Sequence, residues 1–217
     1  DLGDGRSATG AEVEHVNGKA GFYRVAVTVN NRRSADLAWR DLYVVESGAE
    51  AGTEGEAALW SWSDAGSRVT FRDDDVEQLA GKLSLRAEAK PYSGGRLELI
   101  YRPAEERRFG LEGKTELLFW IRTRNENIPA WQGENPVVTL GGPGEARLVL
   151  TPPGDLLSQP AANEAREGWQ LIRVPLAGGE GWKTTGVLPG RLEWLSLGFD
   201  SWGAPPLQIW IDGLTWR

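Results

Sequence analysis

The sequence predicts an all-β fold: a two-sheet antiparallel β-sandwich of the jelly-roll type. Apolar residues recur at every second position through most of the chain, which is the period of a β-strand with one buried face. Helical periodicity is almost absent, so the crossover helices that a parallel α/β sheet requires are missing. The alternating segments are short and are separated by turn-forming residues, a spacing typical of sandwiches.

The first predicted element is a β-hairpin near the N-terminus. Large apolar residues occupy every second position from Tyr23 to Val29, within a strand expected over 22–30. A second strand-like run covers 37–45, and the Asn-Asn-Arg-Arg-Ser sequence between the two runs is typical of a hairpin connection.

Residues 46–56, rich in Gly, Ala and Glu, indicate a loop or boundary after the hairpin. We therefore expect residues 1–45 to be an N-terminal β-hairpin extension or the tail of a preceding domain, and residues 46–217 to be the jelly-roll β-sandwich. Strands of the sandwich are expected at 57–63, 68–71, 82–89, 96–101, 116–122, 137–140, 147–151, 169–176, 192–200 and 207–216. Short helical turns are expected only at 76–80 and 163–167.

Composition restricts the classes of partner. The 217 residues suffice for a sizeable core, and the net charge of −7 argues against nucleic acid or an anionic membrane surface as the main partner. No cysteine is present, which excludes disulfides and thiol nucleophiles, and no apolar stretch approaches the roughly 20 residues that cross a bilayer. Because the chain has no Met, even at position 1, we expect it to be a piece of a longer or processed polypeptide.

Catalytic motifs are missing or incomplete. No serine lies in a Gly-x-Ser-x-Gly elbow, and the single histidine, His15, cannot build a histidine-based metal site and is expected to be incidental. Gly113-Lys114-Thr115 resembles the end of a phosphate-binding loop, but Arg108 stands where the first Gly belongs, so a tight turn is expected. We expect no enzymatic activity, although the abundant carboxylates leave a glycosidase or polysaccharide lyase as an alternative.

Three of the eleven tryptophans fall on the polar phase of predicted strands: Trp120, Trp194 and Trp210. If these strands share a sheet, the tryptophans form a non-core face together with Arg122, Asp200 and Gln208. An aromatic surface beside such polar groups suits a sugar, because pyranose C–H patches stack on rings and sugar hydroxyls form hydrogen bonds with planar polar groups. The alternative is that the hairpin covers this face and makes it a second core layer.

Three other tryptophans lie in polar or Gly/Pro-rich loops: Trp131, Trp182 and Trp202. The loop around Trp131 also supplies Asn127 and Gln132, whose amides can bond sugar hydroxyls. Each of the three tryptophans is either a binding residue or a lid packed on the edge of the sandwich. We place Trp131 and Trp202 first among the binding candidates. Four further tryptophans are interpreted as mainly structural: Trp60, Trp62, Trp169 and Trp216.

Short motifs toward the C-terminus point to a family. The last two of these segments are residues 192–200 and Ile209-Trp210-Ile211-Asp212-Gly213-Leu214. They are preceded by Gly81-Lys82-Leu83-Ser84-Leu85 and by the expected strands at 117–122 and 169–176. These segments resemble the strands of carbohydrate-binding modules of the galactose-binding-like jelly-roll superfamily, which finish with an Ile-Asp-Asp/Gly-Ile/Leu pattern. The resemblance begins near Glu46 and offers no counterpart for residues 1–45.

The resemblance also implies a structural calcium ion. Such modules hold it between an acidic residue near the domain start, backbone carbonyls and the Asp of the final strand, which by position are Glu46 and Asp212 here. The usual Phe-Glu at the domain start reads Val45-Glu46 in this chain. Oxygen-only ligation suits Ca²⁺. The run Asp73-Asp74-Asp75 is expected to be a solvated turn, with a cation site as the alternative.

Together these features predict a non-catalytic carbohydrate-binding module that recognises a polysaccharide or oligosaccharide through tryptophan stacking and polar hydrogen bonds. The resemblance implies that it targets an attached enzyme, as an accessory domain of a larger glycoside hydrolase, and that it is secreted or at a bacterial cell surface. Its expected partners are the glycan and other domains of the same polypeptide. The alternative is a structural accessory β-sandwich domain that packs against a neighbouring domain and binds no sugar.

Overall fold

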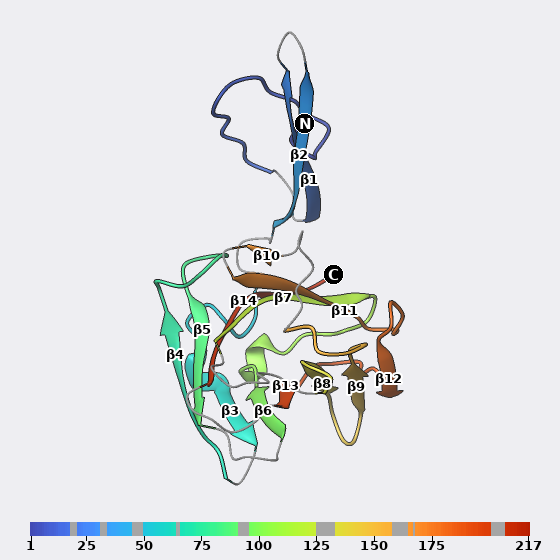
Figure 1. Ribbon diagram of the computed structural model, residues 1–217. Helices are drawn as coiled ribbons and strands as arrows, with labels where there is room; N and C mark the ends of the chain where they lie inside the picture. Colours follow the sequence, from blue (N-terminus) through green and yellow to red (C-terminus); the bar gives the residue numbers. More distant parts are fainter. Residues whose placement is uncertain are drawn as a thin grey trace.

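The structure is a computed structural model that describes residues 1–17, 21–30, 34–44, 50–63, 66–90, 96–124, 133–157, 165–166, 168–200 and 207–217. The described chain is built from β-strands, with two short 3₁₀ turns, η1 (Ala57–Leu59) and η2 (Glu105–Arg107), and two six-stranded sheets pack face to face (Figure 1). The predicted all-β sandwich is confirmed. No helix in the described residues is long and apolar enough to span a membrane.

One layer of the sandwich, named the β14 sheet, has the strand order β10-β11-β7-β14-β5-β4. Its strands are β10 (Ala165–Arg166), β11 (Trp169–Pro175), β7 (Glu116–Arg124), β14 (Leu207–Trp216), β5 (Ser84–Lys90) and β4 (Arg68–Asp74). The other layer, named the β13 sheet, has the order β12-β9-β8-β13-β6-β3. Its strands are β12 (Lys183–Gly186), β9 (Arg147–Thr151), β8 (Val137–Gly141), β13 (Trp194–Asp200), β6 (Arg96–Tyr101) and β3 (Trp60–Ser63).

The core lies between the two sheets, where the apolar phase of each strand points inward. Along β7 the inward residues Leu117, Phe119 and Ile121 are at most 1% exposed, which is the phase that alternation predicts. On β13, Leu195, Leu197 and Phe199 are fully buried in the same cluster. The sequence pattern therefore sorts the side chains of these strands correctly.

The last strand, β14, lies between β7 and β5 at the centre of its sheet and fixes the register of the candidate site. Trp210 is opposite Arg122 on β7 and Arg86 on β5, while Asp212 is opposite Trp120. Directly opposed residues of antiparallel strands point to the same side of the sheet. The outer face of the β14 sheet therefore carries two tryptophans and several charged side chains.

Three short segments differ from the sequence prediction. Residues 76–80 form bends rather than a helical turn, and Ala165–Arg166 pair with β11 as strand β10. Strand β12 was not predicted, because all four of its residues, Lys-Thr-Thr-Gly, are exposed and show no alternation. It lies at the sheet edge and pairs only with β9 among the described strands.

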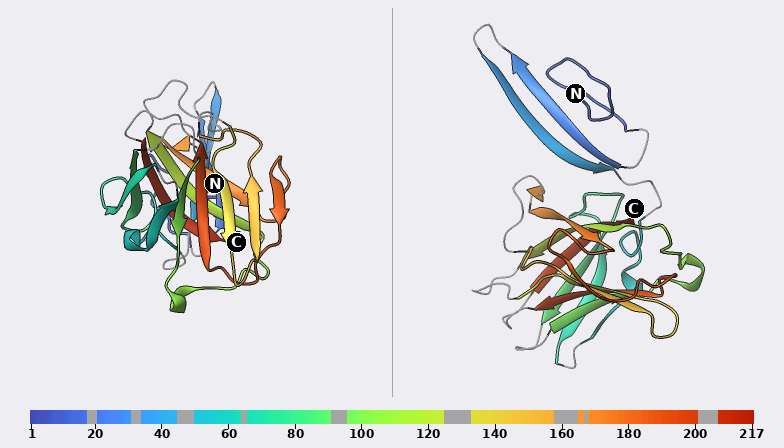
Figure 2. Two further views of the ribbon diagram at one scale, coloured as in Figure 1. Left: turned by 90° about the horizontal axis from the view of Figure 1, so that it is seen from below. Right: turned by 90° about the vertical axis from the view of Figure 1, so that its right-hand side faces the viewer.

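The N-terminal residues form a separate two-stranded sheet of β1 (Gly21–Asn30) and β2 (Ala35–Val44), in register from Gly21↔Val44 to Asn30↔Ala35. This hairpin projects from the sandwich rather than lying across a sheet (Figures 1 and 2). Asp1 exchanges backbone hydrogen bonds of 3.0 Å with Ala26 on β1. His15, expected to be incidental, has its Nε2 3.0 Å from an Asp4 carboxylate oxygen. The domain boundary near residue 45 remains a prediction.

Candidate functional site

The three tryptophans expected to share a face are divided between the two sheets. Trp120 and Trp210 lie on the outer face of the β14 sheet, whereas Trp194 begins β13 in the opposite layer. The single face of three tryptophans required their strands to share a sheet, and that condition is not met. Strand β13 pairs with β6 and β8, which are distant in sequence, and no periodicity within a strand reveals such pairing.

A hollow of about 610 Å³ opens on the outer face of the β14 sheet, with Trp210 among its lining. Ligand sites for small molecules typically have volumes of about 300–1,000 Å³. Strands β4, β5, β7 and β14 each contribute side chains, including Asp74, Arg86, Arg122 and Gln208. Trp120 is half-buried and is not one of the described residues that line this hollow.

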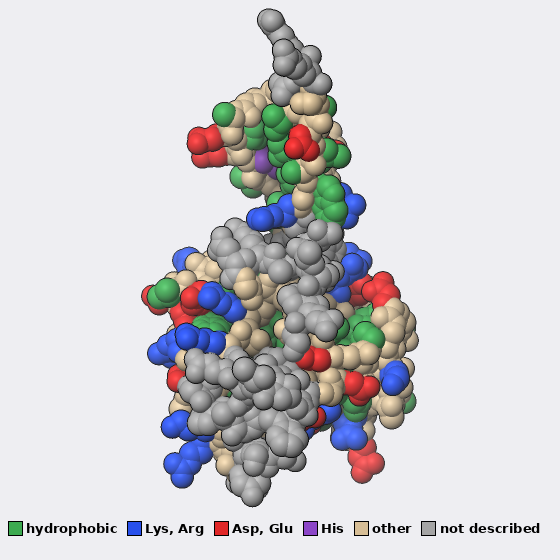
Figure 3. Space-filling model, in the orientation of Figure 1, with side chains coloured by type: hydrophobic (Ala, Val, Ile, Leu, Met, Phe, Trp, Pro, Cys, Tyr) green, Lys and Arg blue, Asp and Glu red, His purple; other side chains and the backbone are tan. Residues whose placement is uncertain are grey.

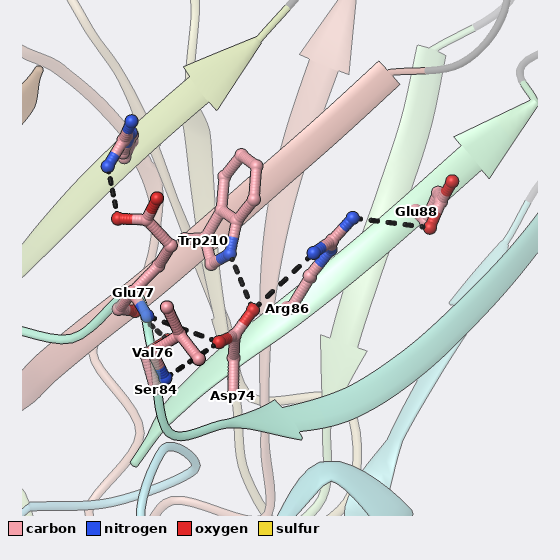
Figure 4. A network of polar contacts seen from close by, with 8 residues as sticks. Asp74, Val76, Glu77, Ser84, Arg86, Glu88 and Trp210 are labelled. Atoms are coloured by element: carbon pink, nitrogen blue, oxygen red, sulfur yellow. Dashed lines mark hydrogen bonds and ion pairs between the residues drawn. The ribbon is translucent and has the colours of Figure 1, made fainter. Parts of the chain in front are cut away.

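Trp210 is fixed by a hydrogen bond to Asp74, which ends β4 (Figure 4). The indole N–H donates to Asp74 Oδ2 over 3.0 Å, and the backbone N–H groups of Val76 and Glu77 donate to Oδ1 over 3.0 and 3.1 Å. Asp74 is only 6% exposed, so the expectation of a solvated turn is wrong at this position. Burial acts to raise the pKa of Asp74, but the hydrogen bonds from Trp210, Glu77 and Val76, together with the positive charge of Arg72, outweigh it and lower the pKa.

Two guanidinium groups lie against the ring of Trp210. The guanidinium carbon of Arg86 is 4.9 Å from the ring centroid and that of Arg122 is 5.6 Å from it, both within cation–π range. Arg86 also forms ion pairs of 3.6 Å with Asp74 and Glu88 (Figure 4). Arg122 pairs with Glu77. Since Trp210 is 6% exposed, it positions the arginines and offers a sugar ring little stacking surface.

The lining of this hollow is cationic although the chain is acidic. Arg72 and Arg124 join Arg86 and Arg122, giving four guanidiniums against the two carboxylates of Asp74 and Glu77. Lys and Arg side chains gather on the side of the sandwich where Figure 1 draws β4 and β5 (Figure 3). The geometry provides directed N–H donors for negatively charged or hydroxyl oxygens.

Trp194 lines a second, smaller hollow of about 370 Å³ beside the turn between β8 and β9. Its half-buried ring lies directly over Gly141, its partner on β8, and a Cβ at Gly141 would lie 1.9 Å from the ring. Arg147, the first residue of β9, also lines this hollow. The Trp194 ring can occupy this position because residue 141 is a glycine and has no side chain.

The other predicted binding residues have different surroundings. Trp182 is 8% exposed and belongs to the core cluster, which agrees with the alternative of a packed tryptophan and not with a binding residue. Gln208 lines the β14-sheet hollow, whereas Asp200 ends β13, where its backbone N–H donates to Asn135 Oδ1 over 2.6 Å. Four predicted residues lie outside the described residues: Asn127, Trp131, Gln132 and Trp202.

The tryptophans interpreted as structural mostly pack inside. Trp60 is 6% exposed and packs on Tyr101 at a centroid distance of 5.4 Å, and Trp169 is 2% exposed. Trp216 is half-buried and makes an edge contact with Phe109 at 5.5 Å. Trp62 is 42% exposed and donates its indole N–H to the Ser67 carbonyl over 3.2 Å.

A cluster of acidic side chains beside the middle of β14 is suited to a metal ion. One carboxylate oxygen from each of Glu50, Glu54 and Asp212 lies within 4.8 Å of the others. Asp212 is fully buried and accepts hydrogen bonds from the backbone N–H groups of Leu79 and Ala80 at 2.5 and 2.9 Å. Glu54 Oε1 accepts from the backbone N–H groups of residues 82 and 83, which tethers the same loop.

Electrostatics in this acidic cluster favour a bound cation. Burial, followed by the charges of Asp212 and Glu54, raises the pKa of Glu50 to about 7. Burial raises the pKa of Asp212 to about 6, partly opposed by its backbone hydrogen bonds. The predicted ligand Asp212 thus has two acidic neighbours. The predicted partner Glu46 lies outside the described residues, and Glu50 and Glu54 were missed because a glutamate-rich loop gives no signal of which members turn inward.

Comparisons with known proteins support the fold. No family model matches the chain, and no curated protein matches it. Among solved structures, one from a study of the promiscuous specificity of carbohydrate-binding modules of the β-sandwich superfamily has a TM-score of 0.53 at 14% identity. That alignment covers 100% of this chain and 83% of the other, so it spans residues 1–45 as well. The chain therefore has the β-sandwich fold of carbohydrate-binding modules.

Two further structures match less closely. A carbohydrate-binding module specific for non-crystalline cellulose, CBM28, has a TM-score of 0.47 at 12% identity, covering 78% of this chain and 93% of that one. A family 11 carbohydrate-binding module of a cellulosomal cellulase from Clostridium thermocellum has a TM-score of 0.43 at 11% identity, with 73% and 88% covered.

Proposed function

We propose that this chain is a non-catalytic module that binds a polysaccharide. The observation that carries the proposal is the hollow of about 610 Å³ on the β14 sheet, into which four strands bring arginine, glutamine and tryptophan side chains. A rigid sheet is a suitable platform for such a site, because its side chains are held by register and lose little freedom on binding. The carbohydrate-binding-module fold supports the same function.

In this proposal hydrogen bonding, rather than ring stacking, dominates recognition at the hollow. Trp210 has little exposed surface and arginines beside it, whereas Gln208 and Arg122 are only half-buried. Guanidinium and amide groups are planar and bind pairs of adjacent oxygens. The loop tryptophans Trp131 and Trp202 remain predicted stacking residues of the same module.

We further propose that the module targets an attached enzyme, a glycoside hydrolase, and acts outside the cell or at its surface. Polysaccharides are too large to enter cells, and binding to one raises the local concentration of substrate for a tethered catalytic domain. The resemblance of the C-terminal strands to those of carbohydrate-binding modules supports the proposal of an attached glycoside hydrolase. It is tested by the domain composition of the complete polypeptide and by the location of the protein in cell fractions.

We also propose that Glu50, Glu54 and Asp212 hold a structural Ca²⁺. The fit is chemical: three carboxylates converge, Glu50 and Asp212 are buried, and a hard cation prefers oxygen ligands. Asp212 belongs to β14, and Glu50 and Glu54 belong to the segment before η1. Because Glu54 also accepts hydrogen bonds from the backbone of residues 82 and 83, an ion there would join three parts of the chain.

The test of sugar binding is a glycan array followed by titration calorimetry on the glycans that bind. Gln208→Ala is expected to weaken binding at the hollow by about tenfold, because a lost hydrogen bond costs about 0.5–1.5 kcal/mol and leaves a sugar hydroxyl unpaired. The matched control is Thr185→Ala on the exposed strand β12 of the other sheet. Absence of binding to every glycan would contradict the proposal.

A second candidate function is a structural accessory domain that packs on a neighbouring domain. It is favoured by the hairpin, on which Val27, Val29 and Leu37 are 56%, 64% and 62% exposed. Isolated two-stranded hairpins are marginally stable in water, so such a surface gains stability when it is covered. Co-purification with another domain of the same polypeptide, together with no glycan binding, would favour this function over the first.

A further inference from the structure

From the charges that line the β14-sheet hollow, we infer that its ligand is an anionic glycan, one whose sugar units carry carboxylate or sulfate groups. This inference rests on the proposed function, since it names the class of polysaccharide that the same site takes. The first step is the charge of the lining, where four arginines face two carboxylates in a chain of net charge −7. A local excess of one charge against the overall sign concentrates ligands of the opposite charge.

The second step is that the acidic residues of the hollow are engaged by the protein itself. Asp74 accepts hydrogen bonds from Trp210 Nε1 and from the backbone N–H groups of Val76 and Glu77. Glu77 is paired with Arg122. A carboxylate that is already hydrogen-bonded repels an incoming anion less than a free one, and it holds its arginine in place.

The third step is the hydrogen-bonding capacity that the arginines retain. A guanidinium has five N–H donors, while Arg122 spends one nitrogen on Glu77 and the Arg86 pairs, at 3.6 Å, are longer than hydrogen bonds. Arg86 Nε is buried and has no hydrogen-bond partner within the described part of the chain. Arg72 is exposed and forms no ion pair within 4.0 Å among the described residues.

The fourth step is geometric, because the arginines are held at fixed positions on β4, β5 and β7, with Trp210 on β14 between β5 and β7. Arg72 lies opposite Arg86 in the β4–β5 pairing, and Arg86 and Arg122 both lie opposite Trp210. Their guanidiniums are held over the Trp210 ring at 4.9 and 5.6 Å. Neighbouring antiparallel strands are about 5 Å apart, so the row presents several cations to one ligand. A neutral sugar needs no such row, whereas a repeating uronate or sulfate pattern matches it.

The test compares glycans that differ only in charge. Short oligogalacturonates, the same oligomers with methyl-esterified carboxyls, a sulfated oligosaccharide and a single-stranded oligonucleotide are titrated into the protein by calorimetry at about 50 and 300 mM NaCl. We expect binding to the oligogalacturonate or to the sulfated oligosaccharide, at least about tenfold weaker binding after esterification, and weaker binding at the higher salt concentration.

Variants assign the binding to the hollow. Arg72→Gln and Arg124→Gln change exposed side chains, so the fold should persist, and each is expected to weaken anionic-glycan binding by about tenfold or more. Arg191→Gln, an exposed arginine outside the hollow, is the control and should bind as the unaltered protein does. Unchanged thermal melting of each variant confirms that folding is intact.

The outcomes are distinguishable. Equal binding of the charged and esterified oligomers would overturn the anionic specificity while leaving the proposed function intact. Binding to no glycan would overturn both. Equal binding of the oligonucleotide would show that the hollow attracts any polyanion and would also overturn the inference, as would undiminished binding by both hollow variants.

Discussion

The indole N–H of Trp210 donates to the buried carboxylate of Asp74 across 3.0 Å, and this contact joins the central strand β14 to the end of the edge strand β4. Arg86, on the strand between them, pairs with the same Asp74 oxygen at 3.6 Å. The floor of the candidate site is therefore a structural network as well as the lining of the proposed binding site. Substitutions there should change stability, and under the proposed function they should also change ligand binding.

Trp210→Phe should destabilise the fold by about 1.5–3 kcal/mol, because the ring volume is largely kept while the buried Asp74 carboxylate loses a donor. Urea denaturation measures the change in the free energy of unfolding. The control is Trp194→Phe, the same substitution at a half-buried tryptophan of the other sheet. Equal losses in both variants would contradict a specific role for the Trp210–Asp74 bond.

Asp74 should contribute to acid sensitivity. Its pKa is lowered in the folded protein, so its contribution to stability is complete above the unfolded-state pKa of about 3.9 and is lost as the pH falls through the lower folded-state pKa. The stability difference between the unaltered protein and Asp74→Asn should therefore be largest above about pH 4 and shrink below it. Urea denaturation at several pH values between about pH 2 and pH 6 measures this stability difference. A difference that is independent of pH would count against this reading, and the exposed neighbour Asp75→Asn is the control.

Added Ca²⁺ should raise the melting temperature, and a chelator should lower it, because an ion between Glu50, Glu54 and Asp212 stabilises only the folded chain. Glu50→Gln should diminish the response to calcium. In chelator at about pH 8, above the raised pKa of Glu50 of about 7, the same variant should be more stable than the unaltered protein, since it removes a buried charge that the other carboxylates repel. Differential scanning calorimetry measures both the rise in melting temperature with calcium and the higher melting temperature of the variant in chelator.

The exposed Glu105→Gln, remote in sequence from the acidic cluster, is the control for the calcium experiment. It should melt and respond to calcium like the unaltered protein. A melting temperature that calcium does not change in any of these proteins would rule out the structural ion.

Gly141→Ala should destabilise the protein by about 1–3 kcal/mol, because the added Cβ would lie 1.9 Å from the Trp194 ring and force the indole to move. In a Trp194→Ala background the same change should cost far less. A double-mutant cycle in urea measures this coupling, and tryptophan fluorescence reports the displaced ring. Additive effects would show that Trp194 does not rest on Gly141.

Much of the sandwich follows from local patterns. The alternation of Leu117, Phe119 and Ile121 fixes which face of β7 is buried, because side chains of a strand alternate strictly between its two sides. Strands β6, β9 and β14 begin and end where turn-forming residues predict. The polar strand β12 cannot be predicted from a local pattern, since it is defined by its pairing with β9.

Alternation along each strand predicts a β-sandwich, the tryptophans that point away from the simplest core of their strands, and an acidic residue, Asp212, in the final strand. Packing between distant segments places Trp194 in the other sheet and buries Trp182. It also brings Arg86 and Arg122 to Trp210, and Glu50 and Glu54 to Asp212. The reason is physical: the direction of a side chain is set by its own strand, whereas its neighbours are set by pairings between strands far apart in the chain.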